Sequence, residues 1–205
     1  MSQSTLKYYK QNAQKIALRY ESADVKDLQN ILKSSFLPGS TLLELGCGSG
    51  RDAVFMLNQG FHVVAVDGAA SMVEEALHHH PELTGNVYTV TLPNDLSEEL
   101  GAFDGVFSVA ALMHLSRPDI EATIIKIQSL LVSKGRFFFS VPIQRDDTQK
   151  NEFDDKGRRF TLLAKNEWMN LFKKQGFDII HSSTTPDGLG RSGILWMNCL
   201  TEKSE

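Results

Sequence analysis

Short apolar runs alternate with amphipathic stretches through the middle of the chain. Runs rich in Val, Leu and Phe occupy residues 41–45, 61–66, 87–92, 103–109 and 136–141. Between them, residues 52–59, 71–79 and about 117–132 place apolar side chains at the spacing of one helix face. Strands that alternate with helices in this order predict a mainly parallel sheet with helices on both faces.

The two ends of the chain follow other patterns. The first residues are polar, and their apolar and aromatic side chains recur at roughly helical spacing. We therefore expect an N-terminal helical cap over residues 1–35 and a Rossmann-like domain over residues 36–205. Near the other end, a helix at 166–175 precedes apolar runs at 177–182 and 194–200, and this close pair adds an antiparallel edge. The predicted fold is α/β, a Rossmann-like doubly wound sheet.

A glycine loop lies between the first predicted strand and the helix after it. Residues 44–50 read Glu-Leu-Gly-Cys-Gly-Ser-Gly. Glycine permits positive φ and leaves no Cβ to block a ligand, and the following helix offers free N–H groups. Asp67 ends the second strand about 20 residues further on, where a carboxylate can accept both hydroxyls of a ribose. Together these features predict a site for a cofactor that contains a nucleoside.

Glu44 separates two kinds of cofactor. Residues 48–53 also fit the dinucleotide pattern, with Ala in the last place. A dinucleotide puts a pyrophosphate at this turn, and the Glu44 carboxylate would repel it. The same carboxylate would attract a cofactor whose amino-acid tail carries an ammonium. S-adenosyl-L-methionine therefore fits better than NAD.

Four motifs resemble those of class I S-adenosylmethionine-dependent methyltransferases. They are the glycine loop through Ala53, the strand ending at Asp67 with Ser71-Met72 behind it, residues 103–115, and residues 131–137. Among members of that family, the chain looks most similar to small tellurite-resistance-like methyltransferases. The resemblance implies a seven-stranded sheet with the last strand antiparallel, which agrees with the pattern above.

The resemblance also implies roles for individual residues. Glu44 would anchor the methionine end, the glycine loop would let the backbone approach the cofactor, and Asp67 would bind the ribose. Met72 and Leu92 would flank the adenine, and Ala110 would line the methionine side. The expected cofactor-binding residues are Glu44, Gly46, Cys47, Gly48, Arg51, Asp67, Gly68, Met72, Leu92 and Ala110. For Arg51, a simple first-turn helix residue is slightly favoured over one that contacts the cofactor carboxylate.

His114 is the candidate catalytic residue, because it is the histidine expected beside the pocket. It would act as a general base or contact the acceptor, and the alternative is a histidine bonded to backbone at a helix entry. Tyr8, Tyr9 and Tyr20 form either an aromatic lid over the reactive methyl group or the packed face of a helix.

Composition narrows the setting. The formal net charge of −4 disfavours a protein held by phosphate backbones, so a small-molecule acceptor is favoured over a nucleic acid. Two cysteines indicate a reducing compartment, and we expect a cytoplasmic protein with no membrane span and no metal site. The oligomeric state is not predicted. Two alternatives stay open: an NAD-dependent oxidoreductase, and a non-catalytic regulator that binds S-adenosylmethionine.

Overall fold

A single mixed sheet organises the chain. The computed structural model describes residues 1–146, 152–188 and 190–204. Its strands are β1 Thr41–Leu45, β2 His62–Asp67, β3 Val87–Thr89, β4 Phe103–Val109, β5 Leu131–Arg145, β6 Phe177–Pro186 and β7 Ile194–Lys203. They form a seven-stranded sheet in the order β3-β2-β1-β4-β5-β7-β6, and β7 runs antiparallel to both of its neighbours. The predicted fold is confirmed, including the antiparallel last strand.

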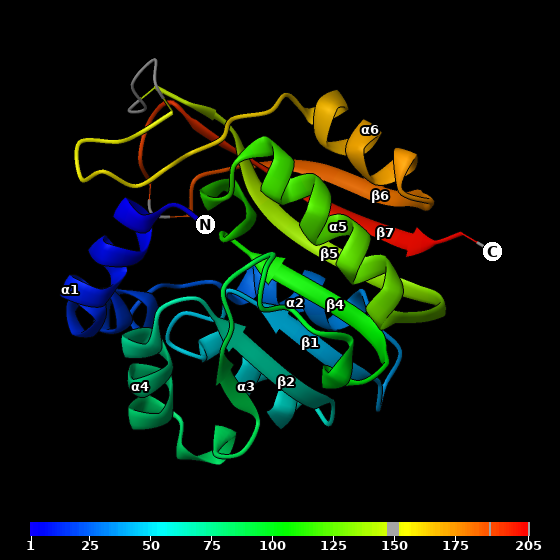
Figure 1. Cartoon of the computed structure of the whole chain (residues 1–205), viewed down its shortest axis with the longest axis horizontal. Helices are drawn as coiled ribbons and strands as arrows, with labels where there is room; N and C mark the ends of the chain where they lie inside the picture. Colours follow the sequence, from blue (N-terminus) through cyan, green and yellow to red (C-terminus); the bar gives the residue numbers. More distant parts are fainter. Residues whose placement is uncertain (147–151, 189, 205) are drawn as a thin grey trace.

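Helices cover both faces of this sheet (Figure 1). They are α1 Gln3–Glu21, α2 Lys26–Ser34, α3 Arg51–Asn58, α4 Ala70–His79, α5 Arg117–Leu130 and α6 Lys165–Lys174. Successive strand residues point to opposite faces, so Val106 packs with α5 and α6 while Phe107 packs with α2, α3 and α4. The sheet is thus buried on both sides, which explains the nearly continuous apolar runs.

Strand lengths differ from those predicted. The sequence pattern predicts that one strand ends before Pro142, yet β5 continues to Arg145. Beyond Ser140 the strand no longer pairs with β4 and pairs with β7 alone. Pro142 then adjoins a shift in register, where the ladder tolerates a missing N–H. At β3 the error is the opposite, because pairing with β2 stops at Thr89.

The first helix lies across the edge where β1, β2 and β4 end (Figure 1). It packs Ile16 and Ala17 against Met72 of α4, and the Nε2 atom of His80 lies 3.1 Å from a Glu21 carboxylate oxygen. Asn12 leaves helical geometry, and its side-chain amide donates to the Tyr8 carbonyl at 2.8 Å. This kink lets α1 follow the rim of the sheet and cover the site below it.

Candidate active site

A cavity of about 120 Å³ lies at the carboxyl ends of β1 and β4, beneath α1. Most of the predicted site residues meet there. Those that line it are Glu44, Gly46, Cys47, Gly48, Arg51, Asp67, Ala110 and His114. We call this space the cofactor pocket. Parallel strands of a doubly wound sheet place ligands at this edge.

The glycine loop forms the floor of the cofactor pocket with backbone atoms. Gly46 has φ +75°, and a Cβ at that position would lie 2.3 Å from the Cβ of Ala111. Gly48 has φ +58° and donates its N–H to Asp67 Oδ2 at 3.0 Å. Only glycine permits this close approach at Gly46, because any side chain would overlap Ala111.

The cofactor pocket is acidic. Glu44, Asp52 and Asp67 line it, and the cationic residues among its lining are Arg51 and Met1, which carries the N-terminal ammonium. Arg51 donates to both carboxylate oxygens of Asp52, at 3.0 and 2.8 Å, and to the Tyr20 carbonyl at 2.8 Å. The single guanidinium is therefore already engaged, and the pocket keeps an excess of negative charge.

Glu44 lines the cofactor pocket with a buried carboxylate. It is 2 % exposed, and its Oε2 atom has no hydrogen-bond partner among the described residues. Burial and the neighbouring Asp52 carboxylate raise the pKa of Glu44 well above its usual range. A buried polar atom normally has a partner, so this oxygen is suited to a cationic or N–H-bearing ligand.

Asp67 and Cys47 complete the loop. Asp67 accepts the Ala69 N–H at 2.8 Å as well as that of Gly48, so its side chain fixes the loop. Burial nevertheless raises the pKa of Asp67, because those bonds only partly offset it. Burial also raises the pKa of Cys47, followed by the Asp67 and Glu44 charges, which keeps the thiol protonated. Cys47 is thus a packing residue and not a nucleophile.

His114 lies beside the pocket in a defined protonation state. It is 3 % exposed, and burial lowers its pKa to about 4. Nδ1 lies 2.6 Å from the Arg159 carbonyl oxygen, which only accepts, so Nδ1 carries the proton. Nε2 then has a free lone pair, which accepts the Tyr9 hydroxyl at 2.9 Å. Both readings of His114 meet here, because it is bonded to backbone and faces the pocket.

Two of the three tyrosines considered as a lid face the pocket. Tyr9 and Tyr20, on either side of the kink at Asn12 in α1, line it. Tyr8 instead packs edge-on against Tyr9, with ring centroids 5.6 Å apart. The Arg159 N–H donates to Thr5 Oγ1 at 2.9 Å, so one backbone segment holds both α1 and His114.

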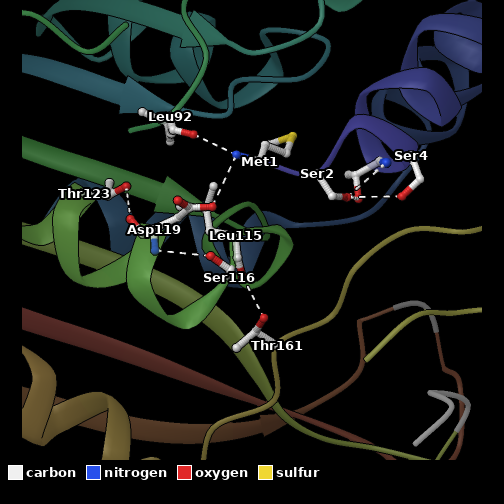
Figure 2. Close-up of polar contacts among 10 residues, drawn as sticks. Met1, Ser2, Ser4, Leu92, Leu115, Ser116, Asp119, Thr123 and Thr161 are labelled. Carbon is white, nitrogen blue, oxygen red and sulfur yellow. Dashed lines mark hydrogen bonds and ion pairs between the residues drawn. The ribbon is translucent and has the colours of Figure 1, made fainter. Parts of the chain in front are cut away.

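Three predicted residues, Gly68, Met72 and Leu92, do not line the pocket. Met72 is fully buried under α1. The Leu6 side chain lies 3.2 Å from where a Gly68 Cβ would be. The Leu92 carbonyl accepts the N-terminal ammonium of Met1 at 2.9 Å (Figure 2). The start of the chain therefore covers the side where we expect the adenine, and the roles of these three residues stay predictions.

A larger cavity of about 690 Å³ adjoins the cofactor pocket. We call it the acceptor cavity. Residues that line both spaces are Tyr9, Tyr20, Arg51, Val109, Ala110 and His114. Ala110 stands at this junction with φ +56°, a strained value for a residue with a side chain. Backbone strain of this kind is typical of functional sites.

Sequence reasoning missed most of the acceptor cavity. Arg145, Phe160, Trp196 and Asn198 line it, from β5, β7 and the segment before α6. The Arg145 guanidinium lies 3.8 Å from the centre of the Phe160 ring. The pairing of β5 with β7 brings Arg145, Trp196 and Asn198 to the site, and Phe160 reaches it because the neighbouring Arg159 carbonyl is bonded to His114. The absence of a glycine loop or fixed spacing left no signal to find them.

The chain belongs to a family of methyltransferase domains, which matches residues 15–182. The prediction of a methyltransferase is thus confirmed at the level of the family. Within the described parts of the chain, no group of three or more His, Cys, Asp or Glu is arranged to hold a metal ion. No helix in those parts is long and apolar enough to cross a membrane.

Individual relatives extend the comparison. A ubiquinone biosynthesis O-methyltransferase of Xanthomonas campestris pv. campestris (strain B100) is 38% identical over 106 residues, 51% of this chain and 44% of the relative. The chain thus spans under half the length of that relative. The crystal structure of the Burkholderia thailandensis 1,6-didemethyltoxoflavin-N1-methyltransferase, with its substrate and S-adenosylhomocysteine bound, superposes with a TM-score of 0.77. That match has 21% identity and covers 98% of this chain and 88% of the other.

The structure of TehB from Haemophilus influenzae is a third similar protein. It superposes with a TM-score of 0.68 at 16% identity, covering 94% of this chain and 67% of TehB. Likeness at such low identity establishes the shared fold. The chemistry of this chain must be argued from its own pocket.

Proposed function

We propose that the chain transfers a methyl group from S-adenosyl-L-methionine to a small-molecule acceptor. The partnerless Oε2 of Glu44 carries this proposal. A buried carboxylate oxygen in an acidic pocket attracts a cation and repels a pyrophosphate. S-adenosylmethionine has both a sulfonium and an ammonium, whereas NAD would bring two phosphates to the same loop. Membership of the methyltransferase-domain family supports the same choice.

The residues present fit that cofactor. Glu44 would accept from the ammonium, and the Gly46–Gly48 backbone would lie against the methionine end. Asp67 would accept from the ribose hydroxyls with the lone pairs that its bonds to Gly48 and Ala69 leave over. When bound, S-adenosylmethionine supplies a methyl group already activated by the sulfonium. The protein then needs to orient the acceptor and exclude water.

His114 would receive the proton that a neutral acceptor loses. Its Nδ1–H is held by the Arg159 carbonyl, so Nε2 keeps a lone pair toward the junction of the two cavities. The Tyr9 hydroxyl donates to that lone pair, and a proton from the acceptor can pass through this hydroxyl to Nε2. Because burial lowers the pKa of His114 to about 4, it is a weak base. Such a base suits an acceptor whose proton becomes acidic as the methyl group is transferred.

Calorimetry tests the cofactor. S-adenosylhomocysteine should bind the wild-type chain and NADH should not. Glu44→Gln should weaken S-adenosylhomocysteine binding about tenfold or more, because the ammonium loses a charged partner. Glu74→Gln, on an exposed position of α4, is the matched control and should stay within about twofold. NADH binding in place of S-adenosylhomocysteine would reject the proposal in favour of an oxidoreductase.

Turnover tests the transfer itself. Thiols, phenols, amines and reduced chalcogen anions can be screened with S-adenosylmethionine by the release of S-adenosylhomocysteine. We expect release with at least one neutral acceptor, and a lower kcat in His114→Ala with cofactor affinity retained. Cofactor binding without turnover across the panel would instead support the non-catalytic regulator. Equal kcat in His114→Ala would remove that residue from the catalytic role.

A further inference from the structure

Asn198 leaves a polar atom unpaired inside the acceptor cavity. It is 4 % exposed and lines that cavity from β7. Its side-chain nitrogen donates to Thr185 Oγ1 at 3.3 Å, but its Oδ1 has no partner in the described parts of the chain. A buried acceptor without a donor costs stability. A ligand that brings an N–H or O–H group to this oxygen would remove that cost.

The position of Asn198 connects it to the reaction centre. Asn198 pairs with Ser140 of β5, and the Ser140 carbonyl accepts the Ala110 N–H at 2.9 Å. Ala110 borders both cavities. The Asn198 side chain therefore stands two strands away from the junction, on the same cavity wall as Ser140. An acceptor held there spans from Asn198 toward His114.

Two arginines that line this cavity are each paired with a carboxylate. Arg158 donates to Asp154 Oδ2 from two nitrogens, at 2.8 and 2.6 Å. Arg191 makes a paired contact with Asp187, at 3.0 and 2.7 Å. Arg159, beside the cavity, also pairs with Glu152. A ligand here therefore meets two arginines, Arg158 and Arg191, that already have carboxylate partners, while the Arg145 guanidinium lies over the Phe160 ring.

We propose that the acceptor cavity selects a neutral acceptor with two polar groups. One is the nucleophilic oxygen or nitrogen at the Ala110–His114 junction, and the second is an N–H or O–H that donates to Asn198 Oδ1. Asn198 is thus a specificity-determining residue. This inference rests on the proposed methyl transfer. On transfer, the acceptor oxygen or nitrogen would bond to the methyl carbon as the bond from that carbon to the sulfonium sulfur breaks, and S-adenosylhomocysteine would leave. The proton of the acceptor O–H or N–H would pass through the Tyr9 hydroxyl to His114 Nε2.

Thermal unfolding without ligand gives the first test. Asn198→Leu has nearly the same size and removes the unpaired oxygen, so its melting temperature should equal that of the wild type or rise by about 2–4 °C. Thr201→Val is the matched control on β7, because Thr201 is fully buried and donates to the Phe137 carbonyl at 3.2 Å. It should melt at a lower temperature than the wild type. A fall in Asn198→Leu as large as that in Thr201→Val would show that Asn198 serves the fold and would overturn the proposal.

Binding to the protein loaded with S-adenosylhomocysteine gives the second test. Catechol, resorcinol and hydroquinone are neutral probes with two O–H groups at different spacing, and their monomethyl ethers and benzoate are the comparisons. At least one diol should bind at least tenfold more tightly than its monomethyl ether, and Asn198→Leu should reduce this preference to less than threefold. Affinity for S-adenosylhomocysteine should stay within twofold in that variant.

The outcomes separate this inference from the proposed function. If S-adenosylhomocysteine does not bind the wild type, the proposed function fails. If it binds, but benzoate binds best, no diol binds, or the diol preference survives in Asn198→Leu, the acceptor inference alone is overturned. Preference for one diol over the other two would in addition measure the distance between the two polar groups.

Discussion

The cofactor pocket and the acceptor cavity share a wall but differ in how they treat charge. The cofactor pocket places three carboxylates beside one guanidinium, and Glu44 Oε2 has no hydrogen-bond partner in the described part of the chain. In the acceptor cavity, Arg158 and Arg191 are each matched by a carboxylate, and the atom without a partner is the neutral amide oxygen of Asn198. One space is prepared for a cation and the other for an uncharged donor.

This difference indicates how one small domain can distinguish two ligands. A buried carboxylate discriminates by charge, since an anion would be repelled over several ångströms. A buried amide discriminates by hydrogen bonding, because it rejects a ligand that leaves it unpaired.

Gly46→Ala should produce the largest effect. Its Cβ would overlap that of Ala111 at φ +75°, so the free energy of unfolding should fall by about 3 kcal/mol. Urea unfolding measures this. Gly60→Ala is the control, because Gly60 has φ +87° but a Cβ added there would meet no described atom within 4 Å. Its free energy of unfolding should fall by about 1 kcal/mol. Equal losses would show that overlap with Ala111 does not add to the cost of the positive φ.

His114 predicts a pH dependence of stability. Its folded pKa of about 4 lies below the unfolded value of 6.5, so the unfolded chain takes up a proton first as pH falls. Stability should therefore be lost between about pH 6.5 and 4, by roughly 2–3 kcal/mol. His114→Gln should lose less over that window, measured by urea unfolding at each pH. His62→Gln, at an exposed position, should behave like the wild type; a curve of unchanged shape in His114→Gln would contradict the buried neutral imidazole.

Asp67→Asn sharpens the contrast from the cofactor side. The variant should weaken S-adenosylhomocysteine binding by about 1.5–3 kcal/mol, because a charged acceptor is lost from the ribose. Asp178→Asn, at an exposed position on β6 beyond the acceptor cavity, is the control and should change it less than twofold. Calorimetry compares the two variants. Equal affinities for Asp67→Asn and wild type would show that Asp67 does not bind the ribose.

Tyr9→Phe should have the smallest effect. It removes the hydroxyl that donates to His114 Nε2, so unfolding should become easier by about 1 kcal/mol. Tyr88→Phe is the control, since Tyr88 is 44% exposed and its hydroxyl donates to the local Gly85 carbonyl. If Tyr9→Phe instead weakens S-adenosylhomocysteine binding tenfold at unchanged stability, the Tyr9 hydroxyl serves cofactor binding and not the contact with His114.

The sequence predicts the cofactor pocket better than the acceptor cavity for a physical reason. Glu44, Gly46 and Gly48 lie in one strand–loop segment, so their chemistry can be read from local spacing. Asn198 and Trp196 reach the site only through the pairing of β7 with β5, which no spacing encodes. The predicted end of a strand at Pro142 is wrong, because the position of Pro142 beside a register shift depends on that same pairing.

The sequence does not predict the contacts of the N-terminal helix α1, for the same reason. The aromatic spacing predicts a helix but not which face meets the pocket. Tyr9 lies 105 positions from His114 in sequence, and their hydrogen bond depends on the tertiary fold. The sequence pattern also predicts Leu92 at the end of a strand, but the pairing of β3 with β2 stops three residues earlier, at Thr89.

The reversed direction of β7 has a consequence for how such a chain can diversify. A strand that runs against its neighbours delivers its first residues, from Ile194 onward, to the rim where the other strands finish. Exchanges at alternate positions there would reshape what the rim recognises while the loop after β1 stays intact. The C-terminal hairpin is thus a place where new partners for the same reaction can evolve, separately from the machinery that supplies the transferred group.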